Sequence, residues 1–209
     1  PKLAGPVLGL ATLALCGWYL NFAGRIAAGE TLTATLDWVP SLGVTASFRI
    51  DGLSLLFLAV ITGIGGLVLM YAAAYMKGND RLGRLYMLLL LFMSSMMGLV
   101  LADDLLLLFV FWELTGICSY FLIGFDSDRP QARAAALQAL LITGIGALAM
   151  LAGFILVGTI GGTYSISGLL ARKPDVIAHG MYPAALLLIV AGAATKSAQV
   201  PFHFWLPAA

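Results

Sequence analysis

The sequence predicts an all-α membrane protein that crosses the bilayer several times. Its 209 residues are 61% hydrophobic and only 10% charged, whereas about a quarter of the residues in soluble domains are charged. The mean hydropathy is +1.01. The apolar residues also gather in runs of roughly 20, the length that a helix needs to cross a hydrocarbon core about 30 Å thick. These three observations indicate a polytopic helical protein.

Six apolar runs define the predicted transmembrane helices, and together they form one membrane domain over residues 1–209. In chain order, the expected spans are residues 4–24, 53–76, 85–102, 105–123, 134–160 and 183–206. The last span contains Pro201, which has no N–H for the carbonyl of Ser197 and whose ring crowds that turn. We therefore expect this helix to kink or unwind beside Lys196.

Two linkers, 25–50 and 161–181, are longer than the others. Thr residues alternate with apolar residues near the start of the first linker, so residues 31–36 are predicted to form a small surface hairpin. Asp51, at the start of the second span, is expected to cap that helix rather than to carry protons.

The placement of basic residues predicts the orientation, because Lys and Arg near span ends are retained on the cytoplasmic side. Six of them gather in compact segments at one side: Lys2, Lys77, Arg81, Arg84, Arg129 and Arg133. Fewer are spread over the two long linkers. We therefore expect linkers 25–50 and 161–181 to lie on the outer, periplasmic side.

Several functions are disfavoured by composition. The net charge is +1 and no long basic run is present, so we expect no nucleic-acid partner. Cys16 and Cys118 lack C-x-x-C spacing, which argues against a disulfide framework, an iron–sulfur cluster or a zinc site. We expect no cofactor and no metal in this chain. It opens on Pro1 without a cleavable signal, and we expect it to be a piece of a longer protein.

One glycine motif in the fifth span has two interpretations. Gly144-x-Gly146-x-x-Ala149 formally resembles a dinucleotide fingerprint, but that motif requires a preceding strand and a solvent-facing helix start. Here the motif lies at the centre of an apolar run. Small residues, including those of Ala149-x-x-x-Gly153, allow membrane helices to approach closely, so the motif favours helix packing.

Two charged residues, Glu113 and Lys196, lie deep inside apolar runs, and they have opposite signs. A charge in hydrocarbon costs about 2.5–3.5 kcal/mol on insertion scales, so an intramembrane acid or base is a functional candidate by default. The alternative is a static buried salt bridge, but such pairs gain little net stability after desolvation. We therefore predict that Glu113 and Lys196 form a proton-translocation site, and whether they touch is left open.

His203 is a third candidate. It would share a helical stripe with Lys196 and Gln199 if the helix continued past Pro201, and it would then serve as a proton relay. The alternative is an interfacial histidine near Trp205. Seven further polar residues are expected to bond between helices or to hold water: Ser94, Ser95, Thr115, Ser119, Gln138, Thr143 and Thr195.

Three segments carry a family resemblance. Residues 111–124 (FWELTGICSYFLIG), 50–54 (IDGLS) and 194–207 (ATKSAQVPFHFWLP) resemble the antiporter-like membrane subunits of Mrp sodium/proton antiporters and of respiratory complex I. The resemblance runs from about Leu36 to the last residue. In the complex I large subunit, the resemblance would imply a basic residue and an Asp near Gly144 and Ala147. Neither is present here, which favours the Mrp branch and, within it, the large A subunit.

The resemblance implies a transporter subunit of the cell membrane rather than an enzyme. It implies that Glu113 and Lys196 are the core of a proton path, and that H+, Na+ and other membrane subunits of a hetero-oligomeric antiporter are the partners. It also implies a further helix upstream and a fold of two inverted five-helix bundles, of which this chain holds part of the first. Two alternatives stay open: a proton-pumping subunit of a complex I-like or membrane-hydrogenase-like oxidoreductase, and a scaffold that transports nothing.

Overall fold

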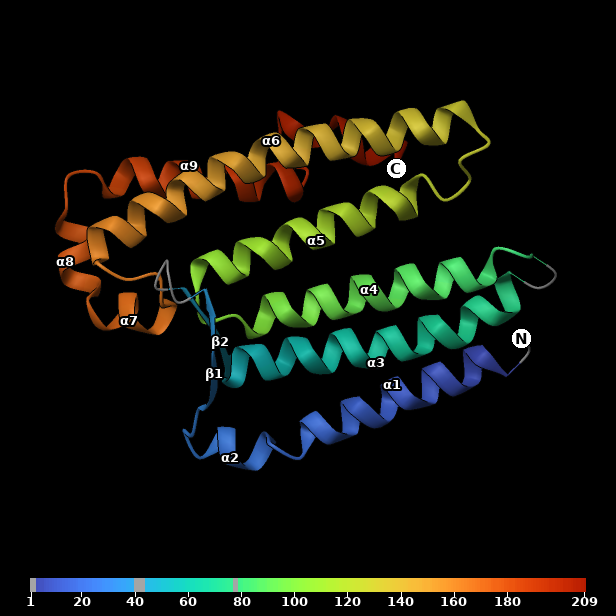
Figure 1. Cartoon of the computed structure of the whole chain (residues 1–209), viewed down its shortest axis with the longest axis horizontal. Coiled ribbons are helices and arrows are strands. Elements are labelled where there is room, and N and C mark those ends of the chain that lie inside the picture. The colour runs from blue at the N-terminus through green and yellow to red at the C-terminus, as the bar shows by residue number, and fades with distance from the viewer. Residues whose placement is uncertain (1–2, 40–43, 77–78) are drawn as a thin grey trace. The chain divides into compact units, whose positions relative to one another are not determined.

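The computed structural model describes residues 3–39, 44–76 and 79–209 (Figure 1). Most of these residues are helical. Within these described ranges, five helices are long and apolar enough to cross a membrane, and they correspond in order to the first five predicted spans. The chain divides into two compact units. Unit 1 comprises Pro1–Ala34 and Phe48–Leu101, and unit 2 comprises Thr35–Ser47 and Ala102–Ala209.

Unit 1 is a set of packed helices. Its helices are α1 (Ala4–Leu20), α2 (Ala23–Ala27), α3 (Gly52–Tyr75) and α4 (Leu82–Leu101). The long helix α3 packs against both α1 and α4 (Figure 1). Leu58 and Leu69 of α3 are almost wholly buried there. Many other apolar side chains are exposed, as expected of helices whose outer faces meet lipid rather than water.

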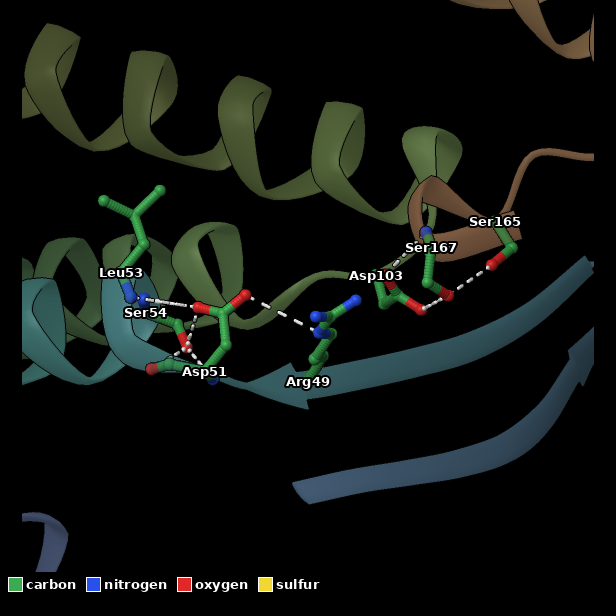
Figure 2. Close-up of polar contacts among 7 residues, drawn as sticks. All are labelled: Arg49, Asp51, Leu53, Ser54, Asp103, Ser165 and Ser167. Atoms are coloured by element: carbon green, nitrogen blue, oxygen red, sulfur yellow. Dashed lines mark hydrogen bonds and ion pairs between the residues drawn. The ribbon is translucent and has the colours of Figure 1, made fainter. Parts of the chain in front are cut away.

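Asp51 caps the start of α3, as predicted. Its Oδ1 atom accepts hydrogen bonds from the backbone N–H groups of Leu53 at 3.1 Å and Ser54 at 3.0 Å. The Ser54 hydroxyl accepts in turn from the N–H of Asp51 at 2.7 Å, which completes a capping box. Figure 2 shows this arrangement, with Arg49 Nε 3.5 Å from Asp51 Oδ2. The hydrogen bond from the Ser54 backbone holds the pKa of Asp51 below its usual range, although burial opposes the effect.

The strands differ from the predicted hairpin. The structure has two paired strands, β1 (Leu32–Val39) and β2 (Val44–Ile50), so the predicted range 31–36 covers only part of the first strand. The prediction was wrong in its bounds because it considered the Thr-rich segment alone. A strand is defined by the segment with which it pairs, and that segment here is residues 44–50.

Unit 2 is built around α6 (Pro130–Gly161), which packs against both α5 (Leu105–Ile123) and α9 (Tyr182–Lys196) (Figure 1). The short helices α7 (Ile166–Ala171) and α8 (Lys173–Ala178) lie between α6 and α9 in the chain. The core of this unit contains Leu105, Met150 and Phe154. The linker after α6 begins at Gly162, whose φ of 65° is a left-handed conformation that suits glycine.

Asp103, in the Asp103–Asp104 turn at the start of α5, forms hydrogen bonds with the linker that follows α6. Asp103 Oδ2 accepts a hydrogen bond from the Ser167 hydroxyl at 2.6 Å, and Ser167 also lies 3.1 Å from the Ser165 hydroxyl (Figure 2). Asp104 caps α5, because its Oδ1 atom accepts from the N–H groups of Leu106 at 2.8 Å and Leu107 at 3.0 Å. Burial raises the pKa of Asp104, and the two backbone hydrogen bonds partly oppose it.

Glycines bring α6 and α9 into close contact. A β-carbon on Gly153 would lie 2.6 Å from Ile189 Cγ1 and 2.8 Å from the carbonyl oxygen of Ala185. A β-carbon on Gly146 would overlap the side chain of Thr195, whereas one on Gly144 would meet nothing within 4 Å. The helix-packing interpretation of the motif is therefore confirmed at Gly146 and does not extend to Gly144.

The sixth predicted span is divided into two helices, as was predicted from Pro201. The α-helix α9 ends at Lys196 after 15 residues, which is too short to cross a bilayer by itself. A turn follows, and then a 3₁₀ helix, η2, spans Phe202–Ala208. Lys196 therefore stands at the end of a broken helix.

Candidate functional site

The side chain of Lys196 extends from the last residue of α9 to the middle of α5. Its Nζ atom donates a hydrogen bond to the backbone carbonyl of Trp112 at 2.7 Å and to the hydroxyl of Thr115 at 2.6 Å. The Thr115 hydroxyl donates to the same Trp112 carbonyl at 2.7 Å. The three polar atoms thus form a closed triangle. The ammonium also lies 4.7 Å from the centroid of the Trp112 ring, which allows a cation–π interaction.

The broken end of α9 is held by hydrogen bonds that replace the helical ones. The Gln199 N–H donates to the Ala194 carbonyl at 2.9 Å, and the indole Nε1 of Trp205 donates to the Thr195 carbonyl at 2.9 Å. The Ser197 carbonyl, which Pro201 cannot bond, accepts from the Gln199 side-chain amide at 3.4 Å. Such replacements are required because an unsatisfied backbone group costs several kcal/mol away from water.

Thr195 sets the position of the lysine relative to α6. Its side chain is buried, and its hydroxyl donates to the Gly192 carbonyl at 2.8 Å. Its methyl and hydroxyl groups occupy the space that Gly146 leaves by lacking a β-carbon. The residue before Lys196 is therefore packed against α6, while the lysine side chain extends to α5.

Glu113 does not share the triangle. It lies next to Trp112 in α5 and is half-buried, but in the described part of the chain its carboxylate forms no direct ion pair with Lys196. The two charges still act on each other electrostatically. Adjacent helix positions are about 100° apart around the axis, since an α-helix has 3.6 residues per turn. The Glu113 side chain therefore leaves the helix in a different direction from that of Trp112. The ammonium is bound by Trp112 and Thr115 instead.

His203 lies away from the triangle. It is exposed on η2, and the stripe that would have joined it to Lys196 and Gln199 is not formed, because α9 ends at Lys196. The structure shows no hydrogen bond between His203 and Lys196 among the described residues. The relay role stays a prediction without the helical geometry on which it depended.

A small cavity of about 30 Å³ adjoins the Lys196 side chain. It is lined by Lys196 and Trp205, by α5 and by α6, and its polar members include Ser119, Tyr120 and Thr143. A water needs roughly 10–15 Å³ of such volume and two to four polar partners, so the cavity has room for one. It extends along α5 to Ile123, the last residue of that helix.

Sequence reasoning identified part of this site. Glu113 and Lys196 were selected by their charge. Thr115, Ser119, Thr143 and Thr195 were expected to bond between helices or to hold water; Thr115 does bond to another helix, whereas the hydroxyls of the other three donate to carbonyls of their own helices. The Trp112 carbonyl was missed, because every residue has such a group. The spacing of Trp112, Gly116 and Ser119 on one helical face was the available signal. Within the described residues, no group of three or more His, Cys, Asp or Glu side chains is placed to hold a metal ion.

Two family profiles match the chain. Residues 102–209 match the family described as NADH:quinone oxidoreductase/Mrp antiporter, transmembrane. Residues 38–86 match the N-terminal family of NADH-ubiquinone oxidoreductase (complex I) chain 5. The first match covers more than half of the chain and contains the whole triangle with Glu113.

Individual proteins are also similar. The probable A/B subunit of a K(+)/H(+) antiporter in Rhizobium meliloti is 48% identical over 182 residues, which are 87% of this chain and 18% of that protein. The A subunit of the Na(+)/H(+) antiporter in Alkalihalophilus pseudofirmus is 42% identical over 196 residues, which are 93% of this chain and 24% of that protein. A chain of the Mrp complex structure from Dietzia sp. superimposes with a TM-score of 0.88 at 37% identity, covering 99% of this chain and 22% of that one.

Proposed function

Because the chain belongs to the NADH:quinone oxidoreductase/Mrp antiporter family, we propose that it is the proton-translocating N-terminal part of the large A subunit in a multisubunit cation/proton antiporter. It is a multi-pass membrane protein, and its place is in the cell membrane, with other membrane subunits as partners. The chain spans only about a fifth to a quarter of the length of the curated relatives it matches. The exchanged cation of the proposal is sodium, as the sequence resemblance implies.

One observation carries the proposal. The Lys196 ammonium is bound to neutral acceptors of α5, on Trp112 and Thr115, while the acid Glu113 is the residue next to Trp112. In the proposed cycle, Glu113 and Lys196 alternate between a paired state and a separated state. The paired state holds an ionised carboxylate and an ammonium together. The separated state has the geometry seen here, with Lys196 on Trp112 and Thr115. Charge movement through this cycle couples to the membrane potential, at about 2.3 kcal/mol per charge per 100 mV.

The cavity beside Lys196 supplies the first step of a route for the proton. Its lining runs from Gly116 to Ile123, at the end of α5 that precedes the linker with Arg129. The basic residues there assign that linker to the cytoplasmic side. Loss of this proton to the cavity leaves a neutral amine. In the proposal, Glu113 takes up a proton while it is separated and passes it to the amine when the two groups pair again, which restores the ionised pair.

The decisive experiment removes each charge in the complete antiporter. Everted membrane vesicles are energised, and the collapse of the pH gradient after addition of NaCl is followed with a fluorescent probe. Glu113→Ala and Lys196→Ala are expected to abolish the sodium-dependent signal while the complex still assembles. The matched control is Lys173→Ala, which removes an exposed lysine at the start of α8 and leaves exchange intact. Unchanged exchange in either site variant overturns the proposal.

A second candidate is a proton-pumping subunit of a complex I-like oxidoreductase, favoured by the match of residues 38–86 to the complex I family. The same vesicles distinguish the two functions. If the chain belongs to an oxidoreductase, the vesicles acidify on addition of NADH or another electron donor, and the signal is insensitive to NaCl. If the chain is a scaffold that transports nothing, the double variant Glu113→Gln, Lys196→Met should behave like the native chain in both assays.

A further inference from the structure

Among the described residues, Thr115 makes a contact that the other threonines of the long helices do not make. Four of them, Thr12, Thr62, Thr143 and Thr159, donate their hydroxyl to the carbonyl four residues earlier in their own helix. Thr115 also donates within its helix, to Trp112, but its oxygen accepts a hydrogen bond from the Lys196 ammonium at 2.6 Å. Its side chain is buried, with 1% exposed. The hydroxyl is therefore used twice, once as donor and once as acceptor.

The geometry of the triangle provides two acceptors for the ammonium. A lysine ammonium has three N–H donors and no acceptor. The Trp112 carbonyl and the Thr115 hydroxyl take two of these donors from one side, and the Trp112 ring covers the ammonium at 4.7 Å. The third donor is not used by these groups. Every one of these acceptors is uncharged, so the ammonium is held here without being neutralised.

Other ionisable groups around Lys196 are few. Glu113 and Cys118 of α5 act on its charge, and Tyr120 lines the adjoining cavity. On the side of α6, the cavity is lined by Ala139, Leu140 and Thr143, which do not ionise. Glu113 is thus the nearby acid with which Thr115 must compete for the ammonium.

We propose that Thr115 is a positioning residue that holds the protonated Lys196 apart from Glu113, in the intermediate through which the proton leaves. The inference rests on the proposed function of Glu113 and Lys196 and adds a residue to it. A proton passing from the paired state to the cavity must cross an intermediate in which the ammonium has left the carboxylate. The Thr115 hydroxyl lowers the free energy of that intermediate by a hydrogen bond to a charged group, which is the stronger kind.

The test compares three variants in the complete antiporter, assayed in everted vesicles with NaCl and normalised to the amount of assembled complex. Thr115→Val keeps the shape of the side chain and removes the hydroxyl. It is expected to lower the maximum exchange rate about tenfold, since a hydrogen bond to a charged group is lost from the intermediate. The sodium concentration for half-maximal exchange should not change, because Thr115 contacts the lysine and not the transported cation.

Two controls separate positioning from packing. Thr115→Ser retains the hydroxyl and should restore most of the rate. Thr62→Val removes a hydroxyl that is equally buried and bonded within its helix but accepts from no charged group, and it should be neutral. The inference is overturned if Thr115→Val exchanges as fast as Thr62→Val, or if Thr115→Ser is as slow as Thr115→Val. Exchange by Lys196→Ala would instead refute the proposed function itself.

Discussion

The indole of Trp205 donates a hydrogen bond to the backbone carbonyl of Thr195, the residue immediately before Lys196, at 2.9 Å. This contact joins η2 to the broken end of α9 across a turn of five residues. The Thr195 carbonyl also accepts from the N–H of Ala198, at the longer distance of 3.3 Å. The tryptophan therefore holds the backbone from which the Lys196 side chain extends.

Replacement of Trp205 by Phe tests this role. The ring is kept and the Nε1 donor is lost, so the Thr195 carbonyl loses its shorter hydrogen bond. The carbonyl keeps the longer bond from Ala198, so the change removes one ordinary hydrogen bond, worth about 0.5–1.5 kcal/mol, which corresponds to local opening that is about two- to tenfold faster. Amide hydrogen exchange at Ala198 and Gln199 in the purified complex should accelerate accordingly. Trp18→Phe, on an exposed tryptophan of α1, is the control, and equal exchange in both variants would contradict the prediction.

The sequence predicts the parts of the candidate site that carry an intrinsic signal. A charge inside an apolar run is costly, and Glu113 and Lys196 were identified for that reason. Pro201 cannot donate a hydrogen bond, and the end of the helix beside Lys196 followed from this. Both inferences depend on a residue's own chemistry and not on the position of its neighbours.

The remainder of the site depends on contacts between distant segments. The Lys196–Thr115 hydrogen bond joins residues on two helices, and no local pattern indicates which hydroxyl the lysine reaches. The Trp205–Thr195 contact likewise requires the path of the chain after Pro201. The strand Val44–Ile50 was missed because it was predicted as part of a loop, and its pairing with β1 is a tertiary contact.

The capping box of α3 predicts a loss of local stability that depends on pH. Asp51→Ala removes an N-cap and should cost about 1 kcal/mol, seen as faster exchange of the Leu53 and Ser54 amides. The pKa of Asp51 is lowered in the folded chain, so its ionised form contributes stability above the ordinary carboxyl range. That contribution is lost as the pH falls below about 4.

Asp51→Asn provides the control, because Asn also caps helices but does not ionise. After correction for the intrinsic effect of pH on amide exchange, the native chain should be more protected than Asp51→Asn at neutral pH. The difference should disappear in acid. A constant difference between the two chains from pH 7 to pH 3 would show that the charge of Asp51 contributes nothing.

Asp104 predicts the opposite dependence at the start of α5. Burial raises the pKa of this carboxyl, so its ionised form is less favourable in the folded chain than in the unfolded one. The native chain should therefore lose stability as the pH rises from about 4 through the raised pKa. Asp104→Asn keeps the cap for Leu106 and Leu107 and removes the ionisation.

Thermal denaturation of the purified complex checks this expectation. The midpoint for Asp104→Asn should rise relative to the native midpoint between pH 4 and pH 8, whereas Asp104→Ala should be less stable throughout, because it lacks the cap. A midpoint difference between Asp104→Asn and the native chain that does not grow with pH would mean that the buried charge has been compensated.

The contact between Gly146 and Thr195 predicts a difference between two glycines that lie two residues apart in one helix. Gly146→Ala places a methyl group where the Thr195 side chain lies, and relief of the overlap must shift α9 at the residue next to Lys196. Overpacking of this kind costs about 1–3 kcal/mol. Gly144→Ala meets open space and should be neutral or slightly stabilising, because Ala is favoured over Gly within a helix by about 0.5–1 kcal/mol.

Thermal denaturation and the sodium-dependent exchange rate, measured on both variants, should therefore separate them: Gly146→Ala lowers both quantities and Gly144→Ala lowers neither. If the two variants behave alike, the close packing of α6 on α9 does not position the lysine.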